Sequence, residues 1–258
     1  MPRVAHRPVA AVALILAGLL SVGLSGDRPW RGRSPLVMPA MMLWVWDHPQ
    51  DLNFIDPQKV GVAFLAERIF LRGDRVEMIP RGHPIFMPPG TVRVAVVRIE
   101  AASDAVLSLE QRREVADAVL SVQRHARLSG IQVDFEAVAS HRPFYRALLN
   151  DLRRRWPTDL AFSITALASW CQEKKWLDDL PADEVVPMFY RMGEDAGREL
   201  RRHFANGGEF RQPICRNPMG LSIDEPRPPH RPGRRLYWFN PKPWTPSVWR
   251  QIVAEVSP

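Results

Sequence analysis

Eight short runs of apolar residues recur along the chain, and most are apolar throughout rather than alternating with polar residues. They cover residues 42–47, 60–65, 92–99, 131–136, 160–167, 184–190, 219–223 and 235–240. Strands that are covered on both faces, such as those of a parallel sheet, have this character. The pattern therefore predicts eight strands that are buried on both sides.

Helical periodicity falls between several of these runs. After SLEQ at 108–111, a capping-box sequence, apolar residues recur at helical spacing up to Ala126. Further helices are expected at 143–156, 194–205 and 245–256, and a short one at 172–180.

Strand–helix alternation with eight strands predicts an α/β fold, a small or degenerate (β/α)8 TIM-type barrel. Some of its helices are expected to be missing or shortened. Residues 70–82 indicate a hairpin in place of a helix, and the proline-rich residues 224–234 indicate a loop. An open α/β sheet is the alternative.

The N-terminus has a different pattern from the rest. Two arginines precede an apolar stretch from Pro8 to Leu24, and small residues follow. This is the pattern of an export signal, with an uncleaved membrane anchor as the alternative. The predicted parts are 1–26, a signal peptide or N-terminal anchor, 27–38, a linker, and 39–258, the barrel domain. We expect an exported protein, periplasmic or extracellular, or one anchored in the inner membrane through this segment.

Composition and charge narrow the classes of function. The chain is 46% hydrophobic and 24% charged, as globular proteins are. The formal net charge is +7, and it is +5 without the two arginines of residues 1–26. The arginine clusters at 153–155, 201–202 and 231–235 are typical of solvated surfaces, and nucleic acid is not an expected partner. The seven histidines have no metal-ligand spacing, so neither a metal nor a cofactor is expected.

The chain has two cysteines, Cys171 and Cys215. In an oxidising compartment the two thiols could pair as a disulfide. Two separate buried thiols are the alternative.

Three polar residues occupy every second position of the fourth run, GIQVDFEA: Gln132, Asp134 and Glu136. Alternate residues of a strand face the same way, so the three form one polar row. In a barrel this row points inward, and Glu136 lies nearest the C-terminal mouth, where barrel active sites are found. Two carboxylates in a partly dry site raise each other's pKa, so one can serve as a general acid. The alternative is a buried polar network with Arg98 or Arg191.

The fourth run resembles the fourth strand of the chitinase-type glycosidases, family eighteen of the glycoside hydrolases. That strand ends in an Asp-x-Asp-x-Glu pattern. Gln132 stands at the first Asp of the pattern, Asp134 at the second, and Glu136 at the catalytic acid.

Other positions agree with this resemblance. Tyr190, in MFY, resembles the tyrosine of a Met-x-Tyr on the sixth strand of that family, and Arg191 stands where an Asp usually follows. Trp238 resembles the tryptophan that floors the sugar subsite of the family. Gln132, Trp238 and Arg191 are candidate substrate-binding residues, and Arg191 could bind an anionic substrate. The ends of the first and third runs add the candidates Trp44, Trp46, Asp47 and Arg98.

A denser resemblance is to an uncharacterised bacterial exported family, a domain of unknown function. It rests on VAFLAERIFL, RVAVVRIE, IQVDFEA, FYRALLNDLR, SITALASWC, VPMFYRMG and YWFNPKPW, and it covers nearly everything from Met42 to Trp244. It implies a secreted or envelope-located barrel related to glycosidases, and it brings no activity of its own.

The chitinase resemblance implies substrate-assisted hydrolysis of an envelope or extracellular polysaccharide that contains N-acetylhexosamine. Glu136 would protonate the glycosidic oxygen, Asp134 would stabilise the oxazolinium ion formed by the substrate's own acetamide, and Tyr190 would donate to that acetamide. Gln132 removes the third acid of the pattern, so the pKa coupling of Asp134 would differ. The alternative is a non-catalytic carbohydrate-binding or scaffold protein of the envelope on the same barrel.

Overall fold

The computed structural model describes residues 38–125, 127–157, 159–173, 176–229 and 231–256. The predicted export signal or anchor, and all but the last residue of the predicted linker, lie outside these residues. Within the described ranges, none of the helices is both long and apolar enough to cross a membrane.

Eight parallel strands close into a barrel. They are β1 Met41–Val45, β3 Val60–Arg72, β6 Arg93–Ala101, β7 Gly130–Glu136, β8 Ala161–Leu167, β9 Glu184–Met188, β10 Pro218–Ser222 and β11 Arg235–Phe239. The strands are neighbours in this order, and β1 pairs in parallel with both β3 and β11, which closes the sheet. The predicted barrel is therefore confirmed, and the open-sheet alternative is wrong.

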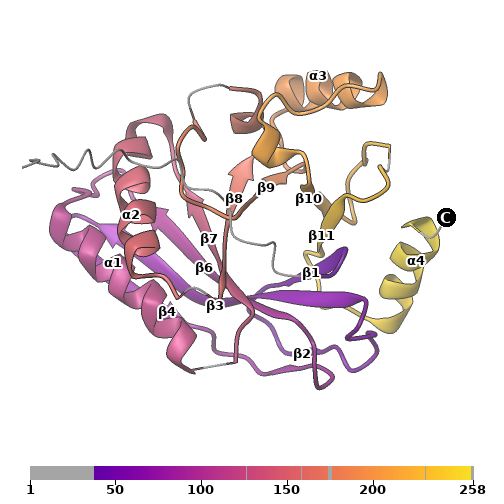
Figure 1. The fold of residues 1–258 in the computed structure, drawn as a ribbon, viewed down its shortest axis with the longest axis horizontal. Coiled ribbons are helices and arrows are strands. Elements are labelled where there is room, and N and C mark those ends of the chain that lie inside the picture. The colour runs from indigo at the N-terminus through magenta and orange to yellow at the C-terminus, as the bar shows by residue number, and fades with distance from the viewer. Residues whose placement is uncertain (1–37, 126, 158, 174–175, 230, 257–258) are drawn as a thin grey trace, which may run out of the picture. The chain divides into compact units, whose positions relative to one another are not determined.

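In the described part of the chain, four α-helices accompany the eight strands, which makes this a degenerate TIM-like α/β barrel. They are α1 Leu109–Val122, α2 Arg142–Arg155, α3 Glu194–Ala205 and α4 Pro246–Val256. The predicted capping box begins α1, where the Ser108 side chain accepts from the Gln111 backbone N–H. In Figure 1, α1 and α2 lie side by side along the flank formed by β6 and β7.

Short 3-10 turns fill several connections, at Gln123–His125, Ala139–His141, Trp170–Gln172 and Pro213–Cys215. The prediction of a short helix at 172–180 is wrong. The 3-10 turn ends at Gln172, and the described residues that follow are extended or in turns.

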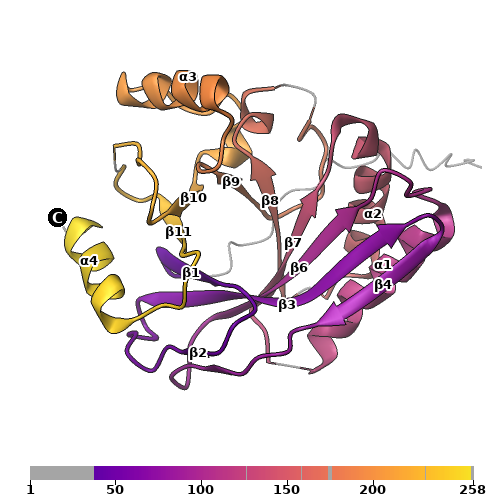
Figure 2. The same cartoon turned by 180° about the vertical axis from the view of Figure 1, so that it is seen from behind.

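β-structure replaces helices in the first two crossovers. The two-residue strands β2 Gln50–Asp51 and β5 Ile85–Phe86 pair with each other, and β4 Arg75–Pro80 pairs antiparallel with the second half of β3. This is the hairpin that residues 70–82 predicted, and Figure 2 shows its two strands running beside α1. The register of β3 shifts between Leu65 and Glu67, as at a β-bulge, where the strand passes from the barrel into the hairpin.

Side chains alternate between the barrel interior and an outer layer. The interior apolar residues are Met42, Trp44, Ala63, Val94, Val96, Val186, Tyr237 and Phe239. On β7, Val133 and Phe135 belong to the outer layer, and Phe135 meets the Tyr145 ring of α2 with ring centroids 5.1 Å apart. This strand therefore packs its apolar side against a helix and turns its polar side into the barrel.

Cys171 and Cys215 form a disulfide, so the first of the two alternatives for the cysteines holds. The bond joins the connection between β8 and β9 to the connection between β9 and β10. Beside it, Trp170 and Trp176 stack with ring centroids 3.8 Å apart. The two connections thus form one packed unit next to β9.

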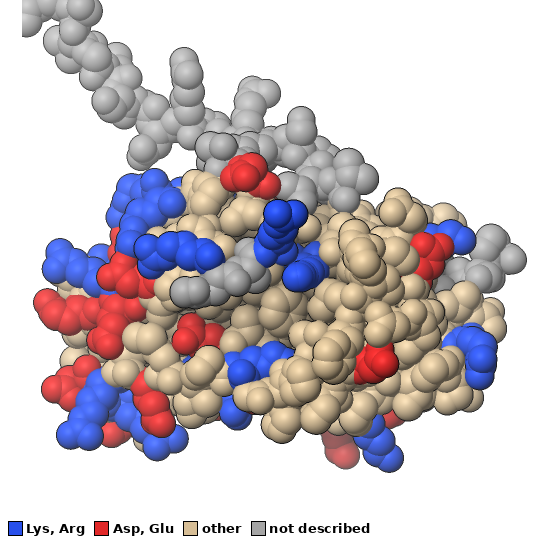
Figure 3. Space-filling view, turned by 90° about the horizontal axis from the view of Figure 1, so that it is seen from below, with Lys and Arg blue, Asp and Glu red and all other residues tan. Residues whose placement is uncertain are grey.

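The arginine cluster at Arg153–Arg155 is a paired surface. Its three guanidinium groups form ion pairs with Asp183, Asp151 and Asp117. On the face shown in Figure 3, basic and acidic side chains likewise lie next to one another. The more exposed pairs of Arg154 and Arg155 contribute little to stability individually. Each of the three arginines has an acidic partner nearby.

Candidate active site

The polar row of β7 enters the barrel and ends at its C-terminal mouth. In the register with β6, Asp134 lies opposite Arg98, and Glu136 lies opposite Glu100. The Asp134 side chain is 6% exposed, whereas the Glu136 side chain at the rim is 51% exposed. The row therefore carries one carboxyl group in a dry layer and one at the solvent boundary.

Arg98 contacts the carboxylates of Glu100, Asp134 and Glu136. Its guanidinium donates to Glu100 Oε1 at 2.8 Å and to Glu136 Oε1 at 2.5 Å, and its Nη1 lies 4.0 Å from Asp134 Oδ2. Thr165 on β8 donates its hydroxyl to Asp134 Oδ1 at 2.5 Å. Asp134 therefore has both the hydrogen bond and the counter-charge that a buried carboxylate needs.

Both carboxyl groups of the β7 row hold their protons more tightly than usual. Burial raises the pKa of Asp134, although the Thr165 hydroxyl and Arg98 act to lower it. Burial also raises the pKa of Glu136, with Arg98 lowering it and the neighbouring carboxylates raising it again. A carboxyl group with a raised pKa is protonated closer to neutral pH, as a general acid must be.

Replacing Arg98 with methionine is expected to lower the free energy of unfolding by about 3 kcal/mol at about pH 8, because Asp134 becomes an uncompensated buried charge. The folded-state pKa values of Asp134 and Glu136 are raised, so the native state binds more protons than the unfolded state. Protonation of these groups therefore stabilises the fold as the pH falls from about 8 to about 5. This gain in stability with falling pH should be steeper in the variant. The loss should shrink accordingly by about pH 5, as urea denaturation at both pH values would measure.

The matched control is Arg98→Lys, which keeps the charge and removes the planar fork that reaches several carboxylates. We expect it to lose less stability than Arg98→Met at the higher pH. An Arg98→Met loss of the same size at both pH values would contradict an electrostatic origin.

Aromatic rings line the mouth beside the carboxyl groups. Tyr190, two residues beyond β9, stacks on Phe239 with ring centroids 5.3 Å apart, and Trp46 meets Phe239 edge-on at 5.8 Å. Burial and the Asp134 carboxylate raise the pKa of the Tyr190 hydroxyl, so it stays protonated and can donate. The guanidinium carbon of Arg191 lies 5.1 Å from the Phe239 ring centre. Tyr190, Trp46 and Arg191 thus gather around Phe239, which the sequence interpretation missed.

Gln132 and Trp44 do not reach the mouth, which corrects the expectation that they bind substrate. Trp44 donates its indole N–H to Gln132 Oε1 at 2.7 Å, and Gln132 donates its amide to the Ser163 hydroxyl at 3.0 Å. The Ser163 hydroxyl lies 3.3 Å from Glu184 Oε2. Gln132 and Trp44 are almost completely buried, one layer deeper than Asp134, and they tie the strands together across the barrel interior.

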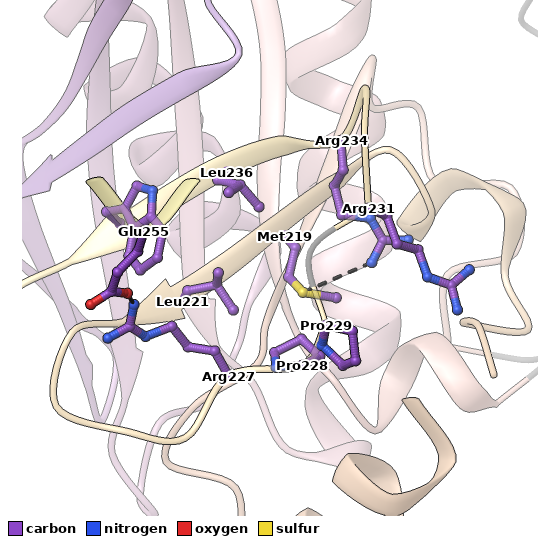
Figure 4. A pocket seen from close by; sticks show the side chains of 10 residues that line it. Met219, Leu221, Arg227, Pro228, Pro229, Arg231, Arg234, Leu236 and Glu255 are labelled. Atoms are coloured by element: carbon purple, nitrogen blue, oxygen red, sulfur yellow. Dashed lines mark hydrogen bonds and ion pairs between the residues drawn. The ribbon is translucent and has the colours of Figure 1, made fainter. Parts of the chain in front are cut away.

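Trp238 faces away from the mouth, which corrects its expected role as the floor of a sugar site. It lines a pocket of about 290 Å³ on the outer side of β10 and β11, where Leu221 and Leu236 also project (Figure 4). Residues alternate along β11, and the inward ones are Tyr237 and Phe239. The resemblance assigns the inward position to the neighbouring residue, and the sequence of this strand, apolar at every position from Leu236 to Phe239, does not distinguish its two faces.

Asp47 lies at the rim but binds the β3–β4 hairpin and the segment that follows it. Its Oδ1 accepts from the Gly82 backbone N–H at 3.2 Å and lies 3.0 Å from His83 Nδ1, and its Oδ2 lies 3.6 Å from Arg68. Partial burial acts to raise the pKa of Asp47, but His83 and the Gly82 N–H lower it overall. Asp47 therefore fixes the hairpin to the end of β1, and its expected role in substrate binding stays a prediction.

A pocket of about 450 Å³ opens where β8 and β9 end, and it extends to α3. Leu167, Met188 and Tyr190 line it from the barrel side, and Leu200 lines it from the helix. This volume lies within the range of small-ligand sites. Because Tyr190 belongs to both, the pocket adjoins the mouth.

Thr165 and the pocket were absent from the sequence interpretation for different reasons. Ser163 and Thr165 occupy alternate positions of an otherwise apolar run, the same signal that identified Asp134, and it could have found them. The pocket had no such signal, because the strand ends and α3 meet only in the folded chain.

The arrangement brings a half-exposed carboxyl group, a buried carboxyl group and a phenol hydroxyl to one aromatic-lined mouth. These are Glu136, Asp134 and Tyr190. Across the described ranges, no cluster of three or more His, Cys, Asp or Glu side chains could hold a metal ion.

Together, the fold and the site define a degenerate TIM-like barrel with a carboxyl pair at its C-terminal mouth. Residues 89–184 match the family model of a domain of unknown function, DUF3142. The matched segment contains Arg98, Asp134, Glu136 and Thr165. No curated protein matches the chain. The expected likeness to a domain of unknown function is therefore shown over this segment, and the likeness to chitinase-type glycosidases stays a prediction.

Proposed function

We propose that the C-terminal mouth of the barrel binds a glycan and hydrolyses it, with Glu136 as the general acid. The observation that carries this proposal is the pair of Asp134 and Glu136. Both carboxyl groups have raised pKa values, and they lie at the end of the barrel that holds the active sites of this fold. Trp46, which is only partly buried, supplies aromatic surface on which the apolar face of a sugar can stack.

In the proposed reaction, protonated Glu136 donates its proton to the glycosidic oxygen as the bond to the anomeric carbon breaks. The acetamide oxygen of an N-acetylhexosamine unit attacks that carbon and forms an oxazolinium ion, so no protein nucleophile is required. Asp134 offsets the positive charge, and the Tyr190 hydroxyl donates to the acetamide. Water then adds to the anomeric carbon, and the Glu136 carboxylate accepts its proton.

Gln132 changes how Asp134 is supported in this scheme. A third acid at that position would share a proton with Asp134, whereas Gln132 is bonded to Trp44 and Ser163. Asp134 instead contacts Thr165 and Arg98. The hydroxyl and the cation favour its ionised form, which is the form that stabilises an oxazolinium ion.

Glycan binding without hydrolysis is the second candidate function. The observation that favours it is the ion pair of Arg98 with Glu136, at 2.5 Å. A guanidinium at this distance stabilises the ionised carboxylate, which has no proton to donate. Hydrolysis therefore requires that a bound glycan draw Glu136 away from Arg98.

The proposal includes export to the periplasm or the extracellular space. Disulfides persist in oxidising compartments, and the Cys171–Cys215 bond supports such a location. The apolar N-terminal segment with its two preceding arginines agrees with it. A polysaccharide of the envelope or the extracellular medium would be accessible there.

Release of new reducing ends from a panel of bacterial polysaccharides tests the proposal. We expect the wild type to release them from a polymer that contains N-acetylhexosamine and Glu136→Gln to release far fewer. Binding by the wild type without release from any polymer would overturn hydrolysis in favour of glycan binding. Neither binding nor release would overturn both functions.

A further inference from the structure

The pocket beside the mouth is lined by both apolar and charged side chains. Leu167 and Met188 are apolar, and Arg191 and Arg211 are basic. The disulfide through Cys171 ties the connection that follows β8 to the connection that carries Arg211. The lining is therefore held by a covalent bond as well as by packing.

Arg191, which lines the pocket and contacts the Phe239 ring of the mouth, has an unfavourable backbone conformation. Its φ is 50°, in the left-handed region that residues with a side chain rarely adopt. Both carboxylate oxygens of Glu225 accept from the Arg191 backbone N–H, at 2.8 and 3.0 Å. Strained residues held in this way concentrate at ligand sites.

The Arg191 guanidinium stands out among the cations around the mouth. Arg98 pairs with three carboxylates, and Arg68 pairs with Asp47. In the described part of the chain, no carboxylate lies within ion-pair distance of Arg191, although Glu199 lines the same pocket. Its cation rests instead against the Phe239 ring, 5.1 Å from the ring centre.

We infer that this pocket binds an acidic sugar of the glycan and that Arg191 binds its carboxylate. The inference rests on the proposed function for the position of the glycan, whose neighbouring unit would lie at Asp134 and Glu136. The planar guanidinium matches a carboxylate through two parallel hydrogen bonds. Its contact with an aromatic ring leaves its N–H groups available for such a partner. Leu167 and Met188 provide apolar surface for the sugar ring.

The experiment compares two probes that differ only in charge. One is a hyaluronan hexasaccharide, which alternates N-acetylhexosamine with a uronic acid, and the other is the same oligosaccharide with its carboxylates reduced to alcohols. Calorimetric titration into Glu136→Gln measures affinity without turnover. At low salt we expect the acidic probe to bind at least about tenfold more tightly than the reduced probe. This preference should fall as salt is added.

Arg191→Asn, made in the same Glu136→Gln background, isolates the cation. Asparagine tolerates the left-handed backbone, so the fold should keep its melting temperature. We expect this variant to lose the preference for the acidic probe and to bind the reduced probe unchanged. Arg250→Gln on the exposed face of α4 is the matched control and should retain the preference.

Equal affinity for the two probes, no binding of either, or a preference that survives Arg191→Asn would each overturn the inference. Hydrolysis of neutral polymers together with any of these results would leave the proposed function standing. Acid-selective binding that depends on Arg191, without hydrolysis of any polymer, would support the inference and overturn the proposed catalysis.

Discussion

Replacing Glu136 with glutamine is expected to lower the turnover of a hydrolysed glycan by about 10²–10⁴-fold, the usual contribution of a positioned general acid. Glutamine has the same size and can still accept from Arg98, but it has no proton to give to the glycosidic oxygen. The wild-type rate should fall as the pH rises through the raised pKa of Glu136, because the acid must be protonated. The variant should lack this dependence.

Two controls separate acid catalysis from a change of charge at the mouth. Glu100→Gln removes a carboxylate from the same guanidinium and should cost much less turnover. An aryl glycoside with an acidic phenol as its leaving group needs little protonation, so the Glu136→Gln defect should shrink on it. Equal defects on both kinds of substrate, or an equal loss in Glu100→Gln, would refute the assignment of Glu136 as the acid.

Loss of the Cys171–Cys215 bond is expected to lower the free energy of unfolding by about 4 kcal/mol, from the loop-closure entropy of a cross-link. The two cysteines are 44 residues apart in the chain, so the bond removes many conformations from the unfolded state. Guanidinium denaturation of the wild type with and without a reductant measures the change. The folded barrel should persist without the bond, because the strands are paired independently of it.

The double variant Cys171→Ser/Cys215→Ser is the matched control for reduction. It should unfold at the same denaturant concentration with and without reductant, and close to the reduced wild type. A wild type that resists reductant, or a double variant as stable as the oxidised protein, would contradict a stabilising disulfide.

The strands could be predicted because most of them are apolar on both faces and each carries its own signal. The helix expected at 194–205 coincides with α3, since its apolar residues recur at helical spacing. The failed helix at 172–180 shows the limit of local patterns. Its described residues pack around the Trp170–Trp176 stack and beside the Cys171 disulfide, and a pattern confined to one segment contains neither contact.

The sequence by itself determined the eight strands and the common direction of Gln132, Asp134 and Glu136, because the alternation of side chains along a strand is local geometry. Only the tertiary structure decided which neighbours these residues have. Register with β6 brings Arg98 to the carboxyl groups, and inward alternation on β11 brings Phe239 rather than its neighbour to the mouth. Register and barrel closure arise from pairing between distant segments, and a shift of one residue reverses every side chain, so no single run could specify the site.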